Sequence, residues 1–184
     1  MICPLQMSRL IEVDEFYLGG VRGKKGRGSP FKSAVAIAVE RKGKKLGRLR
    51  MQVITRCSAQ ELVPFVANNV TSGSTVTTDG WAGYNGLEKE GLQHRRIFQT
   101  KTEDKESVLP GVHLVASLVK RLILGTFQGR YEVKYLQRYL DEYVFRFNRR
   151  STKSPGKRFW RIAQFAAASK PITGALVTSG LSPT

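Results

Sequence analysis

Acidic residues, cysteines and long apolar runs are all scarce in this sequence of 184 residues. Its two cysteines, Cys3 and Cys57, form no CxxC pair, so neither a zinc ribbon nor a disulfide framework is expected. No apolar run approaches the ~20 residues that a membrane-spanning helix needs, and Met1 to Leu10 lacks the apolar stretch of a signal peptide. We therefore expect a cytoplasmic protein with no membrane partner.

The shortage of acids leaves a large positive charge. Lysine and arginine number 31 against 14 acidic residues, which gives a net charge of +17. The basic residues recur from Arg22 to Arg161 rather than gathering in one tail. Because such an excess repels itself in a compact chain, it favours a polyanionic partner, and we expect nucleic-acid binding.

The length suits one domain with a short C-terminal appendage. Apolar runs predict strands at residues 10–17, 33–39, 46–55, 76–78 and 94–98. Helical spacing predicts helices at 59–69, 110–125 and 133–150, with a short helix after Asp79 that ends near Glu90. The pattern therefore predicts an α/β domain with five strands.

Several local signals refine these boundaries. Ser58 and Glu61 have the spacing of a capping box, while Pro110 suits the first turn of a helix and Gly125 its end. The glycine-rich basic segment 19–30 fits neither nucleotide-binding motif, so we expect a flexible loop that touches a nucleic-acid backbone. Residues 153–161 continue the basic charge, and the remainder to residue 184 is expected to be weakly ordered, apart from one turn around 162–168.

Two acids occupy similar places on two of the strands. Asp14 belongs to the apolar run 10–17, and Asp79 directly follows the β-branched run 76–78 before a sharp turn. Acids at the ends of separate buried strands can meet in space and hold a divalent cation. On the helix 110–125, four residues recur on the face opposite the apolar stripe: His113, Ser117, Lys120 and Leu124.

The order of these elements is that of the ribonuclease H-like fold, a mixed five-stranded sheet flanked by helices. Between Ile11 and Arg150 the chain resembles the DDE-type transposases of bacterial insertion sequences, in the group with a Val-Asp-Glu-x-Tyr-x-Gly-Gly start. The matching segments are 13–20, 78–84, 112–121 and 139–150. The resemblance implies a catalytic domain at 1–150 and a basic, partly disordered extension at 151–184.

The resemblance also implies that Asp14 and Asp79 are the first two metal ligands of a catalytic triad. Many relatives carry a glutamate seven residues before a lysine, whereas here that position is His113, whose neutral imidazole can bind a divalent ion. His113 is therefore the expected third ligand. The competing candidates are acids that would otherwise favour the start of the next helix: Glu103, Asp104 and Glu106.

The implied activity is DNA transposition. It comprises metal-dependent hydrolysis of phosphodiester bonds at the element ends and transfer of the 3′-hydroxyl into double-stranded target DNA, with two Mg²⁺ ions bound. Asp14 would bridge both ions, and Lys120 would contact the phosphate beside the scissile bond. A histidine in place of a carboxylate removes one negative charge, so Mn²⁺ should be tolerated better.

Other residues receive expected roles from the same resemblance or from their setting. Four arginines are expected to neutralise the flanking DNA backbone: Arg121, Arg146, Arg149 and Arg150. Trp81 and Tyr84 either stack on an unpaired base or pack under their loop. Glu12 and Glu15 are expected to be structural. Asp141 and Glu142 are expected to pair with Arg138 one turn back, or Glu142 with Arg146 one turn on.

Two other functions stay open, a non-catalytic DNA-binding remnant and a structure-specific nuclease of the same fold that also uses a histidine ligand. Relatives usually carry a DNA-recognition region ahead of the first aspartate, and only thirteen residues precede Asp14. The resemblance further implies a homo-oligomer assembled on DNA and a bacterial, nucleoid-associated location.

Overall fold

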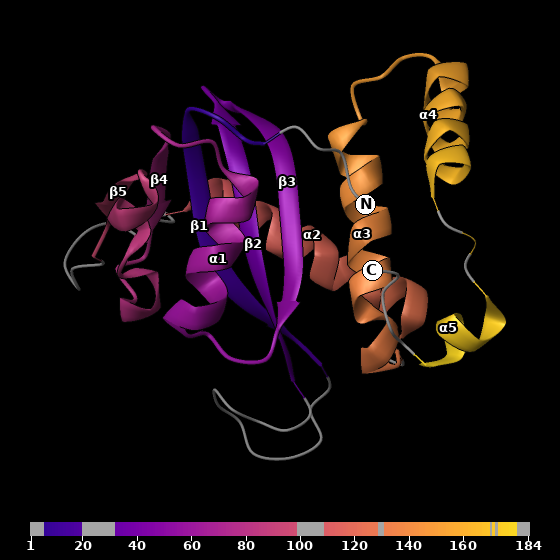
Figure 1. Cartoon of the computed structure of the whole chain (residues 1–184), viewed down its shortest axis with the longest axis horizontal. Helices are drawn as coiled ribbons and strands as arrows, with labels where there is room; N and C mark the ends of the chain where they lie inside the picture. Colours follow the sequence, from indigo (N-terminus) through magenta and orange to yellow (C-terminus); the bar gives the residue numbers. More distant parts are fainter. Residues whose placement is uncertain are drawn as a thin grey trace.

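The computed structural model describes residues 6–19, 32–98, 109–128, 131–169, 171 and 173–179. Five strands form one sheet in the order β3-β2-β1-β4-β5 (Figure 1). They are β1 (Leu10–Leu18), β2 (Ser33–Lys42), β3 (Lys45–Ile54), β4 (Thr75–Thr78) and β5 (Gln93–Arg96). The first three strands form an antiparallel meander, and β4 and β5 continue the sheet parallel to β1. The predicted mixed five-stranded sheet is confirmed.

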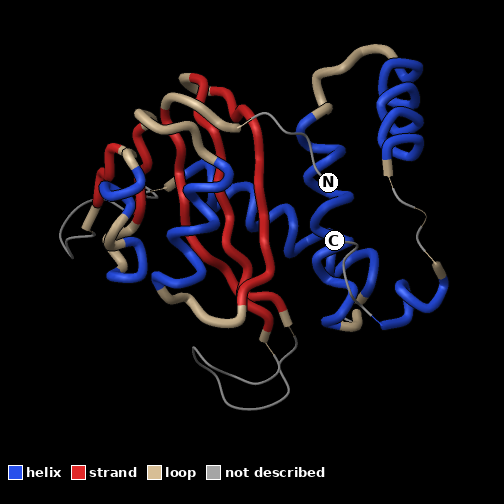
Figure 2. Tube along the Cα trace, in the orientation of Figure 1, coloured by secondary structure: helices blue, strands red, loops and turns tan. Residues whose placement is uncertain are grey.

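Helices cover both faces of the sheet and one of its edges (Figures 1 and 2). α1 (Ala59–Asn69) packs on one face and α2 (Pro110–Phe127) on the other, while α3 (Leu136–Asn148) lies beside β3. Short 3-10 turns are η1 (Ala82–Tyr84), η2 (Leu87–Glu90) and η3 (Val133–Tyr135). The chain continues through α4 (Pro155–Ala168) and α5 (Gly174–Ser179). None of the helices in the described part of the chain is long and apolar enough to cross a membrane.

Alternation along β2 explains why the sheet has two apolar cores. Side chains of successive strand residues point to opposite faces, so the sequence SAVAIAV places large groups on one face and methyl groups on the other. The small face lets α1 approach the sheet closely, and the large face fills the space under α2 and α3. The α2 side carries Val35, Ile37 and Val39, and the α1 side carries Ala34, Ala36 and Ala38.

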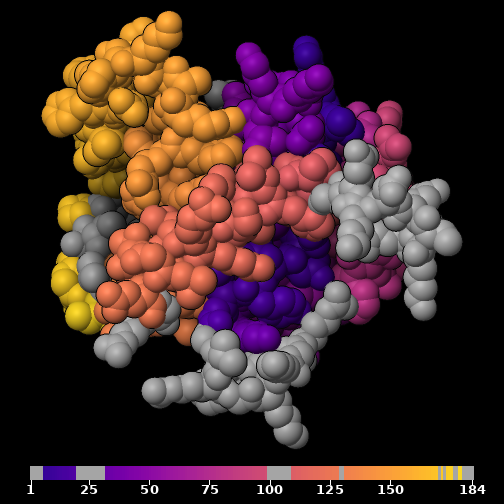
Figure 3. Space-filling view, turned by 180° about the vertical axis from the view of Figure 1, so that it is seen from behind, coloured from indigo at the N-terminus to yellow at the C-terminus, as the bar shows by residue number. Residues whose placement is uncertain are grey.

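The same alternation on β1 points the side chains of Asp14 and Glu15 to opposite faces of the sheet. Phe16 belongs to the core under α2, and Val13 belongs to the core under α1. Asp14 therefore faces α2, whereas Glu15 faces α1. Seen from behind, α2 crosses its face of the sheet with part of β1 in view beside it (Figure 3).

Two helix ends differ from the prediction. α2 passes through Gly125 and ends at Phe127, although a helical glycine costs ~1 kcal/mol relative to alanine. The Phe127 ring lies 4.6 Å from the ring of Tyr139 on α3, and this contact favours the extra residues. The predicted capping box does not form, because Ser58 makes no side-chain cap and the Glu61 carboxylate accepts the backbone N–H groups of residues 55 and 56 rather than that of Ser58.

The C-terminal region is more helical than the sequence led us to expect. Where one turn was predicted, α4 runs for 14 residues, and the six-residue α5 follows. Ser154 caps α4 by accepting the Lys157 N–H at 3.4 Å, and Pro155 stands at the first helical position. This start signal was present in the sequence but was not used. Of the predicted glycine-rich loop at 19–30, residues 20–30 lie outside the described residues.

Candidate active site

Strands β1 and β4 bring the two aspartates together. The parallel pairing places Glu12 beside Thr77, and the same register extended by two residues sets Asp14 beside Asp79. Adjacent strands lie ~4.8 Å apart, so both carboxylates reach the same end of the sheet. Burial raises the pKa of Asp14, and the negative charge of Asp79 raises it further, against the opposing effects of the Glu15 N–H and His113.

His113 joins Asp14 from the first turn of α2. Its Nε2 lies 3.3 Å from the Asp14 Oδ2 atom, with 49% of the imidazole and 16% of the carboxylate side chain exposed. Two ligand atoms bound ~2.1 Å from one octahedral cation are ~3 Å apart when they occupy adjacent positions. The separation of the two side chains therefore suits ligands that share an ion.

Glu12 fixes the start of α2 against β1. Its Oε2 accepts the backbone N–H groups of Gly111 at 2.7 Å and Val112 at 3.0 Å. A carboxylate at this place satisfies N–H groups that have no partner within the helix and complements the positive end of the helix dipole. A Cβ atom on residue 111 would lie only 2.8 Å from Oε2, so glycine permits the close approach.

This clamp has a direct consequence for the site. Glu12 and Asp14 are two residues apart on the same face of β1, and the clamped N–H groups immediately precede His113 in the chain. Arg41 completes the arrangement, with its Nε 3.4 Å from the Glu12 Oε1. The strand that carries the first aspartate thus also positions the histidine. The expected structural role of Glu12 is confirmed.

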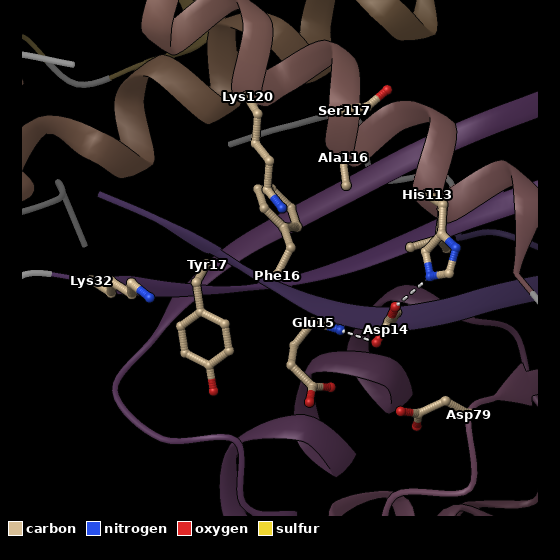
Figure 4. A pocket seen from close by; sticks show the side chains of 11 residues that line it. Asp14, Glu15, Phe16, Tyr17, Lys32, Asp79, His113, Ala116, Ser117 and Lys120 are labelled. Atoms are coloured by element: carbon tan, nitrogen blue, oxygen red, sulfur yellow. Dashed lines mark hydrogen bonds and ion pairs between the residues drawn. The ribbon is translucent and has the colours of Figure 1, made fainter. Parts of the chain in front are cut away.

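The two aspartates and His113 line one pocket with a volume of about 650 Å³ (Figure 4). In Figure 4 these groups lie at one end of the pocket, and Lys32 and Lys120 lie toward the other. Lys120 follows His113 by two helical turns on the same face, as predicted, and its Nζ stands 5.7 Å from the centre of the Phe16 ring. The pocket therefore offers cation-binding groups at one end and ammonium groups at the other.

Glu15 is a pocket residue that the sequence did not assign to the site. It lines the pocket beside Asp14, and its Oε2 accepts a hydrogen bond of 2.9 Å from the hydroxyl of Tyr84. Tyr84 is fully buried, and this burial raises its pKa well above the usual value. The suggestion that Tyr84 stacks on a DNA base is therefore wrong. A carboxylate on the apolar face of a strand needs a polar partner when it is buried. This requirement could have predicted a hydrogen-bonded partner for Glu15.

The turn after β4 holds Asp79 by local hydrogen bonds. Its Oδ1 accepts the backbone N–H of Trp81 at 3.0 Å, and Gly80 adopts a positive φ of 82°. The Trp81 indole N–H donates to the Cys57 carbonyl at 3.0 Å, and the ring does not line the pocket. Trp81 is exposed, so its stacking on DNA stays a prediction.

The four arginines predicted to contact DNA lie outside this pocket. Arg121 is exposed on α2. Glu142, for which Arg138 and alternatively Arg146 were the expected partners, pairs with Arg146 at an Nε to Oε1 distance of 2.7 Å. Asp141 accepts a hydrogen bond from Gln137 instead. Arg150 donates to the main-chain carbonyls of residues 46, 47 and 147, and its burial lowers its pKa. Arg149 lines a different pocket, at the start of α4.

A comparison with known protein families decides to which family this chain belongs. Residues 6–148 match the family described as the ISXO2-like transposase domain. The chain belongs to this transposase family. Asp14, Asp79, His113 and Lys120 all lie within the matched residues, whereas α4 and α5 follow them. Comparison with curated protein sequences gave no match.

Solved structures support the fold of the ISXO2-like transposase domain. A chain of the cryo-electron-microscopy structure of the simian T-cell lymphotropic virus intasome in complex with PP2A regulatory subunit B56 gamma aligns with a TM-score of 0.55 and 11% identity, covering 82% of this chain and 52% of that chain. The catalytic core domain of BIV integrase aligns with a TM-score of 0.51 and 15% identity, covering 88% and 99%. This chain thus spans about half the length of the intasome chain. The shared fold is ribonuclease H-like.

The donor set of this transposase domain fits a divalent cation in part. Asp14 and His113 already have the separation of two ligands on one ion, and Asp79 lies at the same end of the pocket. Within the described ranges, no three Asp, Glu, His or Cys side chains are close enough together to hold a metal. A bound ion would therefore need Asp79 to approach the other two. The competing acids Glu103, Asp104 and Glu106 lie outside the described residues.

Proposed function

We propose that this transposase domain cleaves DNA at element ends and joins the 3′-hydroxyl to target DNA in a reaction that depends on divalent metal ions. The observation that supports this most is the convergence of Asp14, Asp79 and His113 on one pocket, with two of them 3.3 Å apart. These are oxygen and imidazole donors, the groups that bind Mg²⁺ and Mn²⁺ in proteins.

Each pocket residue has a proposed role. Asp14, flanked by the other two, would bridge two Mg²⁺ ions, with Asp79 holding one ion and His113 the other. Bound ions supply charge stabilisation for the attacking and leaving oxygens of an in-line displacement at phosphorus. Lys120 and Lys32 would hold the phosphates next to the scissile bond, because their ammonium groups line the end of the pocket away from the acids.

The surroundings of the pocket would keep these groups in place. Glu12 holds the start of α2, so the imidazole stays beside Asp14 without its own backbone having to adjust. The Tyr84 hydroxyl directs Glu15 by a hydrogen bond. Such a supporting shell reduces the reorganisation needed when the phosphodiester binds. The net charge of +17 would attract the double-stranded DNA, on which the domain would act as a homo-oligomer.

A joining assay tests the proposal. A labelled DNA duplex with a free 3′-hydroxyl is incubated with a supercoiled plasmid, the purified protein and Mn²⁺, and both nicks and joined products are measured. We expect joined products from the wild type. Asp14→Asn should lower the rate by about a thousandfold or more, because several kcal/mol of charge stabilisation are lost.

The controls separate the rival functions. Glu90→Gln, an exposed acid away from the pocket, should leave the rate unchanged. A wild type that binds DNA but neither nicks nor joins it would identify a non-catalytic remnant. Hydrolysis of branched junctions without joining would instead identify a nuclease.

A further inference from the structure

A second pocket, with a volume of about 680 Å³, lies between the C-terminal end of α3 and helix α4. It shares no residue with the catalytic pocket. Figure 1 shows α4 beside α3, on the side away from the sheet. The pocket residues used below are Arg149, Lys157, Arg158, Trp160, Arg161 and Gln164. All but Arg149 come from α4, which follows the residues that match the transposase family.

The lining of this pocket is strongly basic. Four cationic side chains enter it, no acidic residue lines it, and residues 151–184 contain no Asp or Glu at all. Among the described residues, none of these four cations forms an ion pair with a carboxylate. Four uncompensated charges around one concavity repel one another, and an anionic ligand would remove that cost.

Two of the cations are held in position by neutral contacts. The Arg149 guanidinium stacks on Phe145, 4.0 Å from the ring centre, and donates to the Phe145 carbonyl at 3.4 Å. Arg161 donates to the Gln164 side chain at 3.0 Å. A guanidinium held by neutral groups keeps its full charge for a ligand, and its planar fork suits phosphate oxygens.

An aromatic face completes the site. Lys157, Trp160, Arg161 and Gln164 recur at the three- and four-residue spacing of one helical face. The Trp160 side chain is 63% exposed, so its indole is open to solvent in a pocket that four basic side chains also line. Phe159, which is 70% exposed, does not line the pocket. Basic groups combined with an exposed aromatic ring are the features that bind unpaired nucleic-acid strands.

We propose that this pocket binds an unpaired segment of DNA, with phosphates on the basic side chains and a base stacked on Trp160. The volume is within the range of ~300–1,000 Å³ typical of small-ligand sites, so a nucleotide can enter. The choice of DNA over RNA rests on the proposed function. An anionic membrane is the lesser match, since Trp160 lies among cations in a concave site rather than on a continuous apolar face.

Binding of a labelled single-stranded oligothymidine of about 20 nucleotides to the full chain, followed by fluorescence anisotropy, tests the proposal. Trp160→Ala should weaken binding roughly tenfold or more, because a base would lose its stacking partner. Arg158→Glu combined with Arg161→Glu should lower the slope of log K against log salt by about 0.7 for each lost phosphate contact. Phe159→Ala and Lys44→Glu are the matched controls and should bind as the wild type does.

Intrinsic fluorescence adds a second readout, because Trp81 and Trp160 are the two tryptophans of the chain. The oligonucleotide should quench the wild type, and Trp160→Phe should remove most of the quenching. Wild-type binding by both Trp160→Ala and the double arginine variant would overturn the proposal, as would equal losses in Phe159→Ala and Trp160→Ala. Binding to phosphatidylserine and phosphatidylcholine vesicles that requires Trp160, without binding to DNA, would overturn it in favour of a membrane.

Asp14→Asn separates this inference from the proposed function. That variant should keep wild-type affinity for the oligothymidine while losing strand transfer. If strand transfer depends on Asp14 but the α4 variants bind DNA normally, the inference fails and the proposed function stands. If neither the wild type nor any variant joins DNA but binding still depends on Trp160, the proposed function fails and this inference stands.

Discussion

His113 stands where a carboxylate would add a further negative charge next to Asp14. The His113 Nε2 lies 3.3 Å from the Asp14 Oδ2, and an imidazole brings no negative charge to that contact. A glutamate there would instead repel Asp14 and Asp79 until a cation arrived. We therefore expect the identity of this one residue to change both the charge beside Asp14 and the affinity of the pocket for a metal ion.

His113→Glu provides the test at this scale. The added charge should lower the Mg²⁺ concentration that half-supports strand transfer by about tenfold, the equivalent of about 1.4 kcal/mol. The wild type, by contrast, should need less Mn²⁺ than Mg²⁺. Titration of each ion in the joining assay, together with the metal-dependent rise in melting temperature, measures both effects.

His113→Gln is the matched comparison, since it is neutral and cannot supply an imidazole. It should lose the preference for Mn²⁺ without gaining affinity for Mg²⁺. A wild type that works at a lower concentration of Mg²⁺ than of Mn²⁺ would contradict the assignment of His113 as a ligand.

Residues of the site differ in how well the sequence reveals them. Asp14 and Asp79 were expected to meet because each is marked by its own strand. His113 was expected to join them because the resemblance to DDE-type transposases places a ligand seven residues before Lys120. Glu12 and Glu15 could not be placed, because their partners lie 99 and 69 residues away along the chain. A contact at that separation depends on the register of the whole sheet, which local patterns do not encode.

At the level of elements, two side-chain amides of α3 cover the edge of the sheet that β3 forms. Asn148 accepts the Leu49 N–H at 2.7 Å and donates to the Leu49 carbonyl at 3.1 Å. Gln137 accepts the Val53 N–H at 2.7 Å and donates to the Met51 carbonyl at 3.3 Å. These amides reproduce the hydrogen bonds of a further strand, so β3 does not offer its backbone to another chain.

Asn148→Ala should therefore destabilise the domain. It leaves the Leu49 N–H without its partner and the Leu49 carbonyl with the Arg50 side chain as its donor. The lost hydrogen bonds should cost about 1–3 kcal/mol in the free energy of unfolding. Urea denaturation measures the change. Gln52→Ala, which removes an exposed amide from the same strand, should alter the free energy by less than about 0.5 kcal/mol.

The combination of Asn148→Ala with Gln137→Ala should go further and promote self-association through β3. Light scattering at rising protein concentration would detect it. A double variant that is as stable and as monodisperse as the Gln52→Ala control would show that the amides do not protect the edge.

Elements were predicted well where one signal decided them and less well where two competed. All five strands and α1 follow from apolar periodicity, within a few residues at their ends. Gly125 was taken as a stop, but the contact of Phe127 with Tyr139 outweighs its low helix propensity. α4 was not predicted as a full helix. It buries no residue, so its apolar residues do not form the stripe of a helix that packs on a core.

For the whole molecule, the segment from residue 153 onward adds positive charge more than it adds stability. α4 touches the body through the ring of Phe165, which lies 6.4 Å from that of Phe145, and an aromatic pair contributes only ~0.5–1.5 kcal/mol. A chain ending at Thr152 loses five basic residues and no acid, so its net charge falls from +17 to 17 − 5 = +12.

That shortened chain should remain folded. Its melting temperature, measured by calorimetry, should fall by no more than about 4 °C, as expected for a loss of ~1 kcal/mol. Its affinity for DNA should decline less steeply with salt than that of the full chain. Loss of a cooperative unfolding transition would contradict the view that residues 6–148 fold as a unit.

The hydrogen bonds from the first turn of α2 to Glu12 fix the start of that helix. The position of the helix therefore does not depend on which residue stands at 113. Since neither the imidazole nor any replacement at that place has to hold the backbone, an exchange of histidine for glutamate there should cost little stability. A domain with that exchange would differ in the charge beside Asp14 and keep the same architecture.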